Sequence, residues 1–332
     1  MPSANVGIAG PFPLTRFNTL FPGQFGVAGT ANETGLRTDS NGAVFYVDPN
    51  FPGVSDLRDG TDPTSPLATV AAALAKCQPY RNDVIYVMAN NSWQYGDPTD
   101  GRATAISEEV TITVPGVRLV GVCPPGSMGV YWTPASDGGT CITVSAIDVL
   151  IEGFCFTEGA YNGCNGIASE WDGATLFGEN LTVRHCHFDD TVDTAIALEY
   201  SWYCDIHDNV FQQCDAYGVY VDTAGSGVAY CHIHDNQFRD CGTGAISLLG
   251  GSDDNWVYRN AIYNTSAQAG AAATNEGIDT TGGANNMVMG NFLSCLLPVP
   301  ANGDIDDLCS GAATDAWVAN LCLDGTQVAT PT

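Results

Sequence analysis

The stretch Ile206-His-Asp-Asn-Val-Phe211 decides the fold, because it returns almost unchanged as Ile233-His-Asp-Asn-Gln-Phe238. In each copy an apolar residue is followed five positions later by a phenylalanine, with an asparagine three positions after the first residue. Looser copies of this phrase stand on both sides, at the pairs Ile151/Phe156, Val183/Phe188, Val257/Ile262 and Val288/Leu293. The chain therefore repeats one short structural unit.

A second phrase, made of alternating strand residues, precedes each of the last five copies. Alternation with a period of two indicates β-strands and not helices. The copies recur at a spacing of roughly 23 to 32 residues, which is typical of a solenoid whose coils stack on one another. The second phrase occupies Gly166–Glu170, Ala195–Glu199, Gly218–Asp222, Ala245–Leu249 and Gly277–Thr281.

Stacking of the coils predicts two columns of side chains. Adjacent coils lie about 4.8 Å apart, so the aromatic members of the first phrase should form one inward column: Phe156, Phe188, Phe211 and Phe238. Asn209, Asn236, Asn260 and Asn291 should form a second column at a turn. Asparagine tolerates the left-handed backbone conformation there, and its side-chain amide can bond to the asparagine one coil away.

This pattern resembles the right-handed parallel β-helix of the pectate-lyase-like superfamily, and the resemblance covers residues 44–325. It implies an all-β fold, a single-stranded parallel solenoid with an N-terminal capping helix. The chain is most similar to the β-helical capsid decoration proteins and tailspikes of phages. Residues 1–43 are then an extended N-terminal arm and residues 326–332 a C-terminal tail.

The capping helix is expected at about residues 66–77. Ser65 followed by Pro66 is typical of an N-cap with proline at the first helical position. Four residues then form one apolar stripe: Leu67, Val70, Ala71 and Leu74. Such a helix would cover the strand edges that the first coil leaves unpaired.

The N-terminal arm carries four phenylalanines among prolines, glycines and small polar residues, and neither strand nor helix periodicity fits it. A solvated linker rarely contains so many aromatic residues. We therefore expect the arm to bind a partner surface through Phe12, Phe17, Phe21 and Phe25.

Charge and hydropathy argue against two kinds of partner. The 332 residues carry a formal net charge of -27, from 37 acidic and 10 basic residues. Nucleic acid is not expected, because phosphate binding needs clustered lysines and arginines. No apolar stretch is long enough to cross a membrane, and the N-terminus lacks the basic and apolar parts of a secretory signal. We expect no membrane partner, and synthesis in a host cytoplasm.

The 13 cysteines leave a disulfide framework open. Cys204 and Cys231 share a register position in adjacent coils, as do Cys214 and Cys241, and neighbouring coils are close enough for disulfides. Reduced thiols that act as small apolar residues are the favoured interpretation. No C-x-x-C pair occurs, which argues against a structural zinc site. No metal and no cofactor are predicted.

The candidate catalytic residues form an outward acidic column, Glu170, Glu199 and Asp222, at the end of the second phrase. Carboxylates about 5 Å apart suit a retaining glycosidase, and carboxylates nearer 10 Å suit an inverting one. Calcium binding and an ordinary solvated acidic face are the alternatives. The Gly-His-Gly and Arg-x-Lys elements of polygalacturonase-like hydrolases are absent, and Asp189-Asp190 is an isolated fragment of their pattern.

His207 and His234 should also stack, beside Asp208 and Asp235. Such an arrangement could be an acid/base pair, a transition-metal site or a solvent-facing ladder. Arg184 shares the column one coil earlier, and a cation disfavours a metal site.

The function that these observations favour is that of a non-enzymatic virion structural protein of a tailed bacteriophage. The expected role is that of a capsid decoration or cement protein, or of a tailspike, attached through the N-terminal arm and located on the virion surface. Its expected partners are itself, as a homotrimer, capsid or tail proteins and a host glycan. The sheet face that carries Ala197, Tyr220 and Ser247, together with Val210, is expected to pack against other copies. The alternatives are a polysaccharide lyase or glycoside hydrolase that uses the acidic column, and a bacterial surface adhesin.

Overall fold

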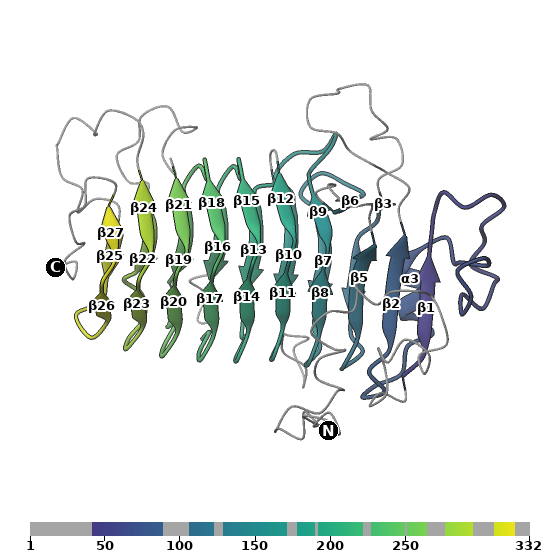
Figure 1. The fold of residues 1–332 in the computed structure, drawn as a ribbon, viewed down its shortest axis with the longest axis horizontal. Helices are drawn as coiled ribbons and strands as arrows, with labels where there is room; N and C mark the ends of the chain where they lie inside the picture. The colour runs from purple at the N-terminus through teal and green to yellow at the C-terminus, as the bar shows by residue number, and fades with distance from the viewer. Residues whose placement is uncertain are drawn as a thin grey trace, which may run out of the picture.

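The computed structural model describes residues 42–88, 106–122, 129–170, 178–189, 192–221, 227–249, 251–263, 276–294 and 309–322. Within these ranges the chain winds into one solenoid with three sheets, and successive coils add successive strands to each sheet (Figure 1). All strand pairs are parallel, as β14 with β17 and β15 with β18 illustrate. The predicted all-β parallel solenoid is confirmed.

Sheet A has ten strands, which lie in chain order from the first coil to the last. They are β1 (Val44–Val47), β2 (Val84–Met88), β5 (Arg118–Val122), β8 (Leu150–Glu152), β11 (Thr182–Arg184), β14 (Asp205–His207), β17 (His232–His234), β20 (Trp256–Tyr258), β23 (Met287–Met289) and β26 (Ala316–Val318).

Sheet B follows sheet A within each coil after a sharp turn and has nine strands. They are β3 (Ile106–Ser107), β6 (Val130–Thr133), β9 (Phe154–Phe156), β12 (His187–Asp189), β15 (Val210–Gln212), β18 (Gln237–Arg239), β21 (Ala261–Tyr263), β24 (Phe292–Ser294) and β27 (Leu321–Cys322).

Sheet C completes the coil with eight strands. They are β4 (Val110–Ile112), β7 (Thr140–Val144), β10 (Asn165–Ser169), β13 (Thr194–Leu198), β16 (Tyr217–Val221), β19 (Gly244–Leu248), β22 (Glu276–Thr280) and β25 (Cys309–Gly311).

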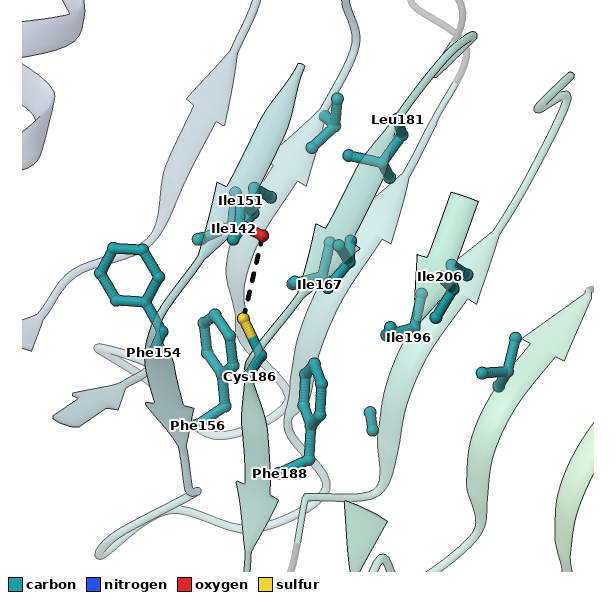
Figure 2. Packing of buried hydrophobic residues seen from close by; sticks show 14 of the residues in the cluster. Ile142, Ile151, Phe154, Phe156, Ile167, Leu181, Cys186, Phe188, Ile196 and Ile206 are labelled. Atoms are coloured by element: carbon teal, nitrogen blue, oxygen red, sulfur yellow. Dashed lines mark hydrogen bonds between the residues drawn. The ribbon is translucent and has the colours of Figure 1, made fainter. Parts of the chain in front are cut away.

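The core between the sheets contains the predicted phenylalanine column. Phe156, Phe188, Phe211 and Phe238 are fully buried. Their ring centroids lie 5.0, 4.9 and 4.4 Å apart along the column, and the last two pairs are parallel to within 3°. Figure 2 shows Phe156 and Phe188 facing the isoleucines of the other two sheets, among them Ile142 and Ile167. In each of these coils sheet B therefore contributes one phenylalanine to the interior, and this ring packs against aliphatic residues of sheets A and C.

The predicted asparagine ladder is also present, at the turn between sheets A and B. Nδ2 of Asn209 donates to Oδ1 of Asn236 at 3.1 Å, and Nδ2 of Asn236 donates to Oδ1 of Asn260 at the same distance. Each Oδ1 also accepts the backbone N–H of the asparagine one coil earlier, 3.0 Å for Asn209 to Asn236. The ladder thus satisfies buried backbone groups at every turn.

The expected left-handed conformation of these asparagines is wrong. The residues with positive φ stand one position earlier, at Asp208 with 55°, Asp235 with 54° and Arg259 with 55°. The hydrogen bonds of the ladder explain the difference. Each asparagine must point its amide inward to donate to a backbone carbonyl oxygen of the preceding coil, as Nδ2 of Asn236 does to Ile206 at 2.8 Å. The residue before it makes the reversal and faces solvent.

Cys204 and Cys231 are buried free thiols in a second ladder, at the turn between sheets C and A. The Cys204 N–H donates to Sγ of Cys231 at 3.3 Å, and the Cys231 N–H donates to Oδ1 of Asn255 at 3.0 Å. The hydrogen bond with Cys204 and burial raise the pKa of the Cys231 thiol well above its usual value. These cysteines therefore act as hydrogen-bonding ladder residues and not only as apolar ones.

The helix has different bounds from those predicted. The helix α3 spans Val70–Leu74, and its N-cap is Thr69, whose side chain accepts from the Ala72 N–H. Ser65 is not the cap, because it closes a turn with Asp62 and Leu67 then forms a parallel bridge with Val47 before the helix begins. The Glu108 carboxylate accepts from the first helical N–H groups, of Val70 at 3.1 Å and Ala71 at 3.2 Å. The helix contacts β1, β2 and β4 at the N-terminal end of the solenoid, and its capping role stays a prediction.

The face expected to pack against other copies is less open than predicted. Ser247 on β19 is buried, and Ala197 and Tyr220 on the neighbouring strands are only half-exposed, as is Val210 on sheet B. Ser247 is therefore wrong as a surface contact. Among the described residues no helix is long and apolar enough to span a membrane.

Candidate functional site on the outer face of sheet A

The predicted acidic column falls at the C-terminal end of sheet C strands. Glu170 directly follows β10 and Glu199 directly follows β13, and the backbone N–H of Glu199 donates to the carbonyl oxygen of Ser169 at 3.1 Å. The two glutamates thus stand on consecutive coils. Glu170 is exposed and Glu199 is half-buried, whereas Asp222 lies outside the described residues. A catalytic role for this column stays a prediction, as does partner binding by Phe12, Phe17, Phe21 and Phe25, which also lie outside the described residues.

The densest polar chemistry in the described part of the chain lies on the outer face of sheet A. His207 on β14 and His234 on β17 are register partners, and their rings stack with centroids 5.0 Å apart and planes within 2°. Tyr258 on β20 continues the stack at 4.6 Å from His234. The predicted histidine stack is confirmed, and the tyrosine extends it by one coil.

Each histidine is oriented by the aspartate that follows it. Nδ1 of His207 lies 2.7 Å from Oδ2 of Asp208, and Nδ1 of His234 lies 2.7 Å from Oδ2 of Asp235. The left-handed turn at each aspartate brings its carboxylate back beside the ring. Nε2 of His234 meets a further carboxylate, Oδ1 of Asp205, at 3.0 Å. Both ring nitrogens of His234 are therefore occupied by carboxylate oxygens.

Two arginines complete the face. Arg259 makes a bidentate contact with Asp235, with Nε 2.9 Å from Oδ1. Burial raises the pKa of the Asp235 carboxyl, but the hydrogen bonds from Arg259 and His234 outweigh it and hold the pKa below its usual value. One coil before the histidines, Nη2 of Arg184 lies 2.9 Å from Glu152, whose other oxygen meets His185 at 3.1 Å. Most charges of the face are therefore paired, but Nε of Arg184 is buried without a hydrogen-bond partner, and Nε2 of His207 lies 4.0 Å from Oδ2 of Asp205.

This pairing limits the chemistry of the face. A general base needs a nitrogen or oxygen that is open to substrate. Both nitrogens of His234 already meet carboxylates, whereas Nε2 of His207 lies 4.0 Å from Oδ2 of Asp205 and makes no hydrogen bond to it. A metal site needs three or more converging ligands. In the part of the chain that the structure describes, no group of three or more His, Cys, Asp or Glu residues is arranged to hold a metal ion. The geometry therefore disfavours an acid/base role for His234, and the choice between an acid/base pair and a ladder stays a prediction for His207.

Comparison with known proteins agrees with this architecture. Residues 136–262 match the family model described as right handed beta helix region. The chain folds as a right-handed parallel β-helix. No curated protein matches its sequence.

Three solved structures illustrate the likeness. An alginate lyase from Paenibacillus sp. str. FPU-7 is 14% identical, with 76% of this chain and 94% of that chain covered and a TM-score of 0.52. A mutant DFA-IIIase from Arthrobacter chlorophenolicus A6 is 14% identical, with 85% and 68% covered and a TM-score of 0.50. ORF18 of Geobacillus virus E2 is 14% identical, with 84% and 60% covered and a TM-score of 0.44. At such identities the likeness shows the fold alone.

Proposed function

We propose that this β-helix is a non-enzymatic structural protein of a tailed-phage virion. It acts as a capsid decoration protein, or in a tailspike-like role, and is attached to capsid or tail proteins through the arm of residues 1–43. After synthesis in the host cytoplasm it resides on the virion surface as a homotrimer. A rigid rod of this kind needs no substrate site, only a stable body and a means of attachment.

The observation that carries this proposal is the network of paired charges on sheet A. His234 is held by Asp205 and Asp235, Asp235 is also held by Arg259, and Arg184 is held by Glu152. Each of these groups already has a charged partner inside the same chain, and His207, whose Nε2 lies 4.0 Å from Oδ2 of Asp205, is held by Asp208 through Nδ1. Paired charges of this kind rigidify a surface, whereas a reactive site keeps one group poised for its substrate. The network therefore favours a structural role.

The arm provides the test of attachment. A variant that lacks residues 1–40 should keep the strand content of the full chain, because no described strand begins before Val44. It should fail to co-sediment with particles that the full chain binds. As a matched control, Phe12, Phe17, Phe21 and Phe25 can be replaced together by serine in the full-length chain. Unchanged particle binding by both variants would contradict attachment through the arm.

A second candidate function, a polysaccharide lyase or hydrolase, is favoured by one observation. Glu170 and Glu199 stand on consecutive coils of sheet C, and a separation of about 5 Å between coils suits paired carboxylates of a retaining enzyme. The chain should be incubated with acidic and neutral polysaccharides, and new reducing ends or unsaturated products measured. Turnover that Glu199→Gln abolishes would establish the enzyme and overturn the structural role.

A further inference from the structure

Exposed aromatic residues gather at one corner of the solenoid, where sheet C turns into sheet A. Trp202, Tyr203, Tyr230 and Trp256 each expose between 43% and 55% of their surface. They belong to three consecutive coils, since Trp202 forms a parallel bridge with Ala229, and Ala229 with Asp253. We call these four residues the aromatic corner. It adjoins the histidine ladder but shares no residue with it.

The rings of the aromatic corner are ordered along the solenoid axis. Tyr203 and Tyr230 stack with centroids 5.3 Å apart and planes within 13°. Trp256 stacks on His232 of the preceding coil at 5.4 Å and 10°. Stacking therefore orders these rings into one continuous aromatic surface along the solenoid.

Two residues of the aromatic corner occupy a backbone conformation that does not suit them. Tyr203 and Tyr230 have φ of 59° and 58°. This left-handed region is unfavourable for bulky residues and much less so for asparagine and aspartate. In the other coils the same turn position is filled by Asn180, Asp254 and Asn285, with φ of 53°, 57° and 59°. The left-handed conformation at this turn position therefore favours asparagine or aspartate.

The two tyrosines also add little to the core, because about half of each is in solvent. A strained position that carries an exposed aromatic ring on two successive coils points to a surface that meets a ligand. Neither the repeat pattern of the coils nor the packing of the core explains why tyrosine stands at these two positions.

The carboxylates around the aromatic corner indicate the chemical class of that ligand. Asp253 is exposed on the same turn as Asp254, and the Asp205 side chain, two residues after Tyr203, is 43% exposed. Oδ1 of Asp205 is held by His234 and Oδ1 of Asp253 accepts from the Ala284 N–H, so the second oxygen of each carboxylate is the one offered to a ligand. Ionised carboxylates only accept hydrogen bonds, so they call for a ligand rich in O–H or N–H donors. An apolar protein partner would bury them without donors, at a high desolvation cost.

The net charge of the chain argues against a polyanionic ligand. The whole chain carries a formal charge of -27 with a single lysine, Lys76, and a second acidic surface or an acidic polymer would be repelled. A neutral carbohydrate meets both requirements, because its C–H faces can lie against aromatic rings while its hydroxyl groups donate to carboxylates.

We propose that the aromatic corner is a binding site for a neutral polysaccharide or oligosaccharide, with Tyr203, Tyr230 and Trp256 as the apolar surface and Asp205 and Asp253 as hydroxyl acceptors. The site is distinct from the acidic column at Glu170 and Glu199 and from the arm. It stands or falls independently of attachment to a virion.

The turn position supplies a variant that separates binding from folding. Replacing both tyrosines by the residue that other coils use, Tyr203→Asn with Tyr230→Asn, should relieve backbone strain. The unfolding midpoint of this variant should be equal to or higher than that of the natural chain, whereas carbohydrate binding should fall at least about tenfold, since two ring contacts are lost. Tyr80→Asn is the matched control, because Tyr80 is also exposed and has a φ of 57° but lies before β2.

Binding should be measured on the full chain by titration calorimetry and tryptophan fluorescence. The probes are neutral hexasaccharides of β-1,4-glucan, β-1,3-glucan, α-1,4-glucan and β-1,4-mannan, with an acidic oligogalacturonate for comparison. We expect at least one neutral probe to bind, the tyrosine double variant to lose that binding and Tyr80→Asn to keep it.

Three results would overturn the proposal: no binding of any neutral probe, stronger binding of the acidic probe, or equal binding by the double variant. Sedimentation of the same samples tests the competing occupant. If the tyrosine substitutions convert an oligomer into a smaller species, the aromatic corner is a contact between copies and the carbohydrate proposal is wrong.

Discussion

Asn236 shows how one residue can hold three coils together. It accepts from the Asn209 N–H at 3.0 Å, donates to the Ile206 carbonyl oxygen at 2.8 Å and donates to Asn260 at 3.1 Å. Asn209, Asn236 and Asn260 are buried, so hydrogen bonds lost with the Asn236 amide could not be replaced by water. The ladder therefore fixes the register of the turns as firmly as the apolar core does.

Asn236→Ala should lower the free energy of unfolding by about 2 to 4 kcal/mol, because it removes the acceptor of the buried Asn209 N–H and a donor to the Ile206 carbonyl oxygen. Asn236→Cys should cost less, since the chain itself places Cys186 in this column, where the thiol hydrogen-bonds to the Arg184 carbonyl oxygen at 3.3 Å. Urea denaturation of both variants provides the measurement. Equal costs for alanine and cysteine would contradict the hydrogen-bonding role of the ladder.

Glu152 makes stability depend on pH at the residue scale. Burial raises the pKa of its carboxyl, but hydrogen bonds and charge attraction from His185 and Arg184 outweigh burial and hold the pKa below its usual value. A carboxyl whose pKa is lower in the folded chain contributes stability above its unfolded pKa, and that stability is lost as pH falls through the folded value.

Glu152→Gln should therefore reduce the free energy of unfolding by about 2 kcal/mol at pH 7, where the pair with Arg184 is charged. The difference from the natural chain should shrink at pH 3, where the natural carboxyl also becomes neutral. Denaturant titrations at the two pH values test this, with Glu170→Gln as an exposed control for the loss of one charge. A gap of the same size at both pH values would rule out the ion pair as its source.

At the scale of elements, the phenylalanines of sheet B form the central column of the core. Phe211 lies between Phe188 at 4.9 Å and Phe238 at 4.4 Å, and all three are fully buried. Phe211→Ala should cost about 3 to 5 kcal/mol, because it removes a buried ring and leaves a cavity between two stacked neighbours. Phe211→Leu should cost markedly less.

Thermal and urea unfolding of the two Phe211 variants check this order. A cost below about 1 kcal/mol for Phe211→Ala would mean that the column does not carry the packing that its burial indicates.

Much of the fold could be predicted from the sequence because inward positions obey one rule in every coil. An inward residue must be apolar or must take part in the hydrogen bonds of a ladder. The repeats are therefore visible in the sequence, as Phe211 with Phe238 and Asn209 with Asn236 show. The bounds of α3 could not be predicted in this way. Pairing of Leu67 with Val47 competes locally with the helix and delays its start to Val70.

Outward positions obey no such rule, and this is where the predictions of function were weakest. Burial of Ser247 on sheet C could not be seen, because its neighbours in sequence alternate as they would on an open face. The aromatic corner did leave a signal. Tyr203 and Tyr230 stand in a turn column that other coils fill with Asn180, Asp254 and Asn285, but this signal becomes meaningful only once the φ angles are known.

At the scale of the whole molecule, the parallel coils make a long, stiff body with different chemistry on each side. Sheet A carries paired charges, the turn between sheets C and A carries exposed rings, and sheet C carries Glu170 and Glu199 at its strand ends. Such a body can present a surface at a fixed distance from its point of attachment. That property suits the virion role that we propose, in which residues 1–43 would serve for attachment.

The proposed virion role is tested most directly by quantitative mass spectrometry of purified particles from a phage lysate in which this chain is produced. We predict that the chain is present after stringent purification, in a copy number that is a multiple of three and in a fixed ratio to the major capsid or tail protein. Its absence from purified particles, with the chain recovered only free in the lysate, would contradict a structural role in the virion.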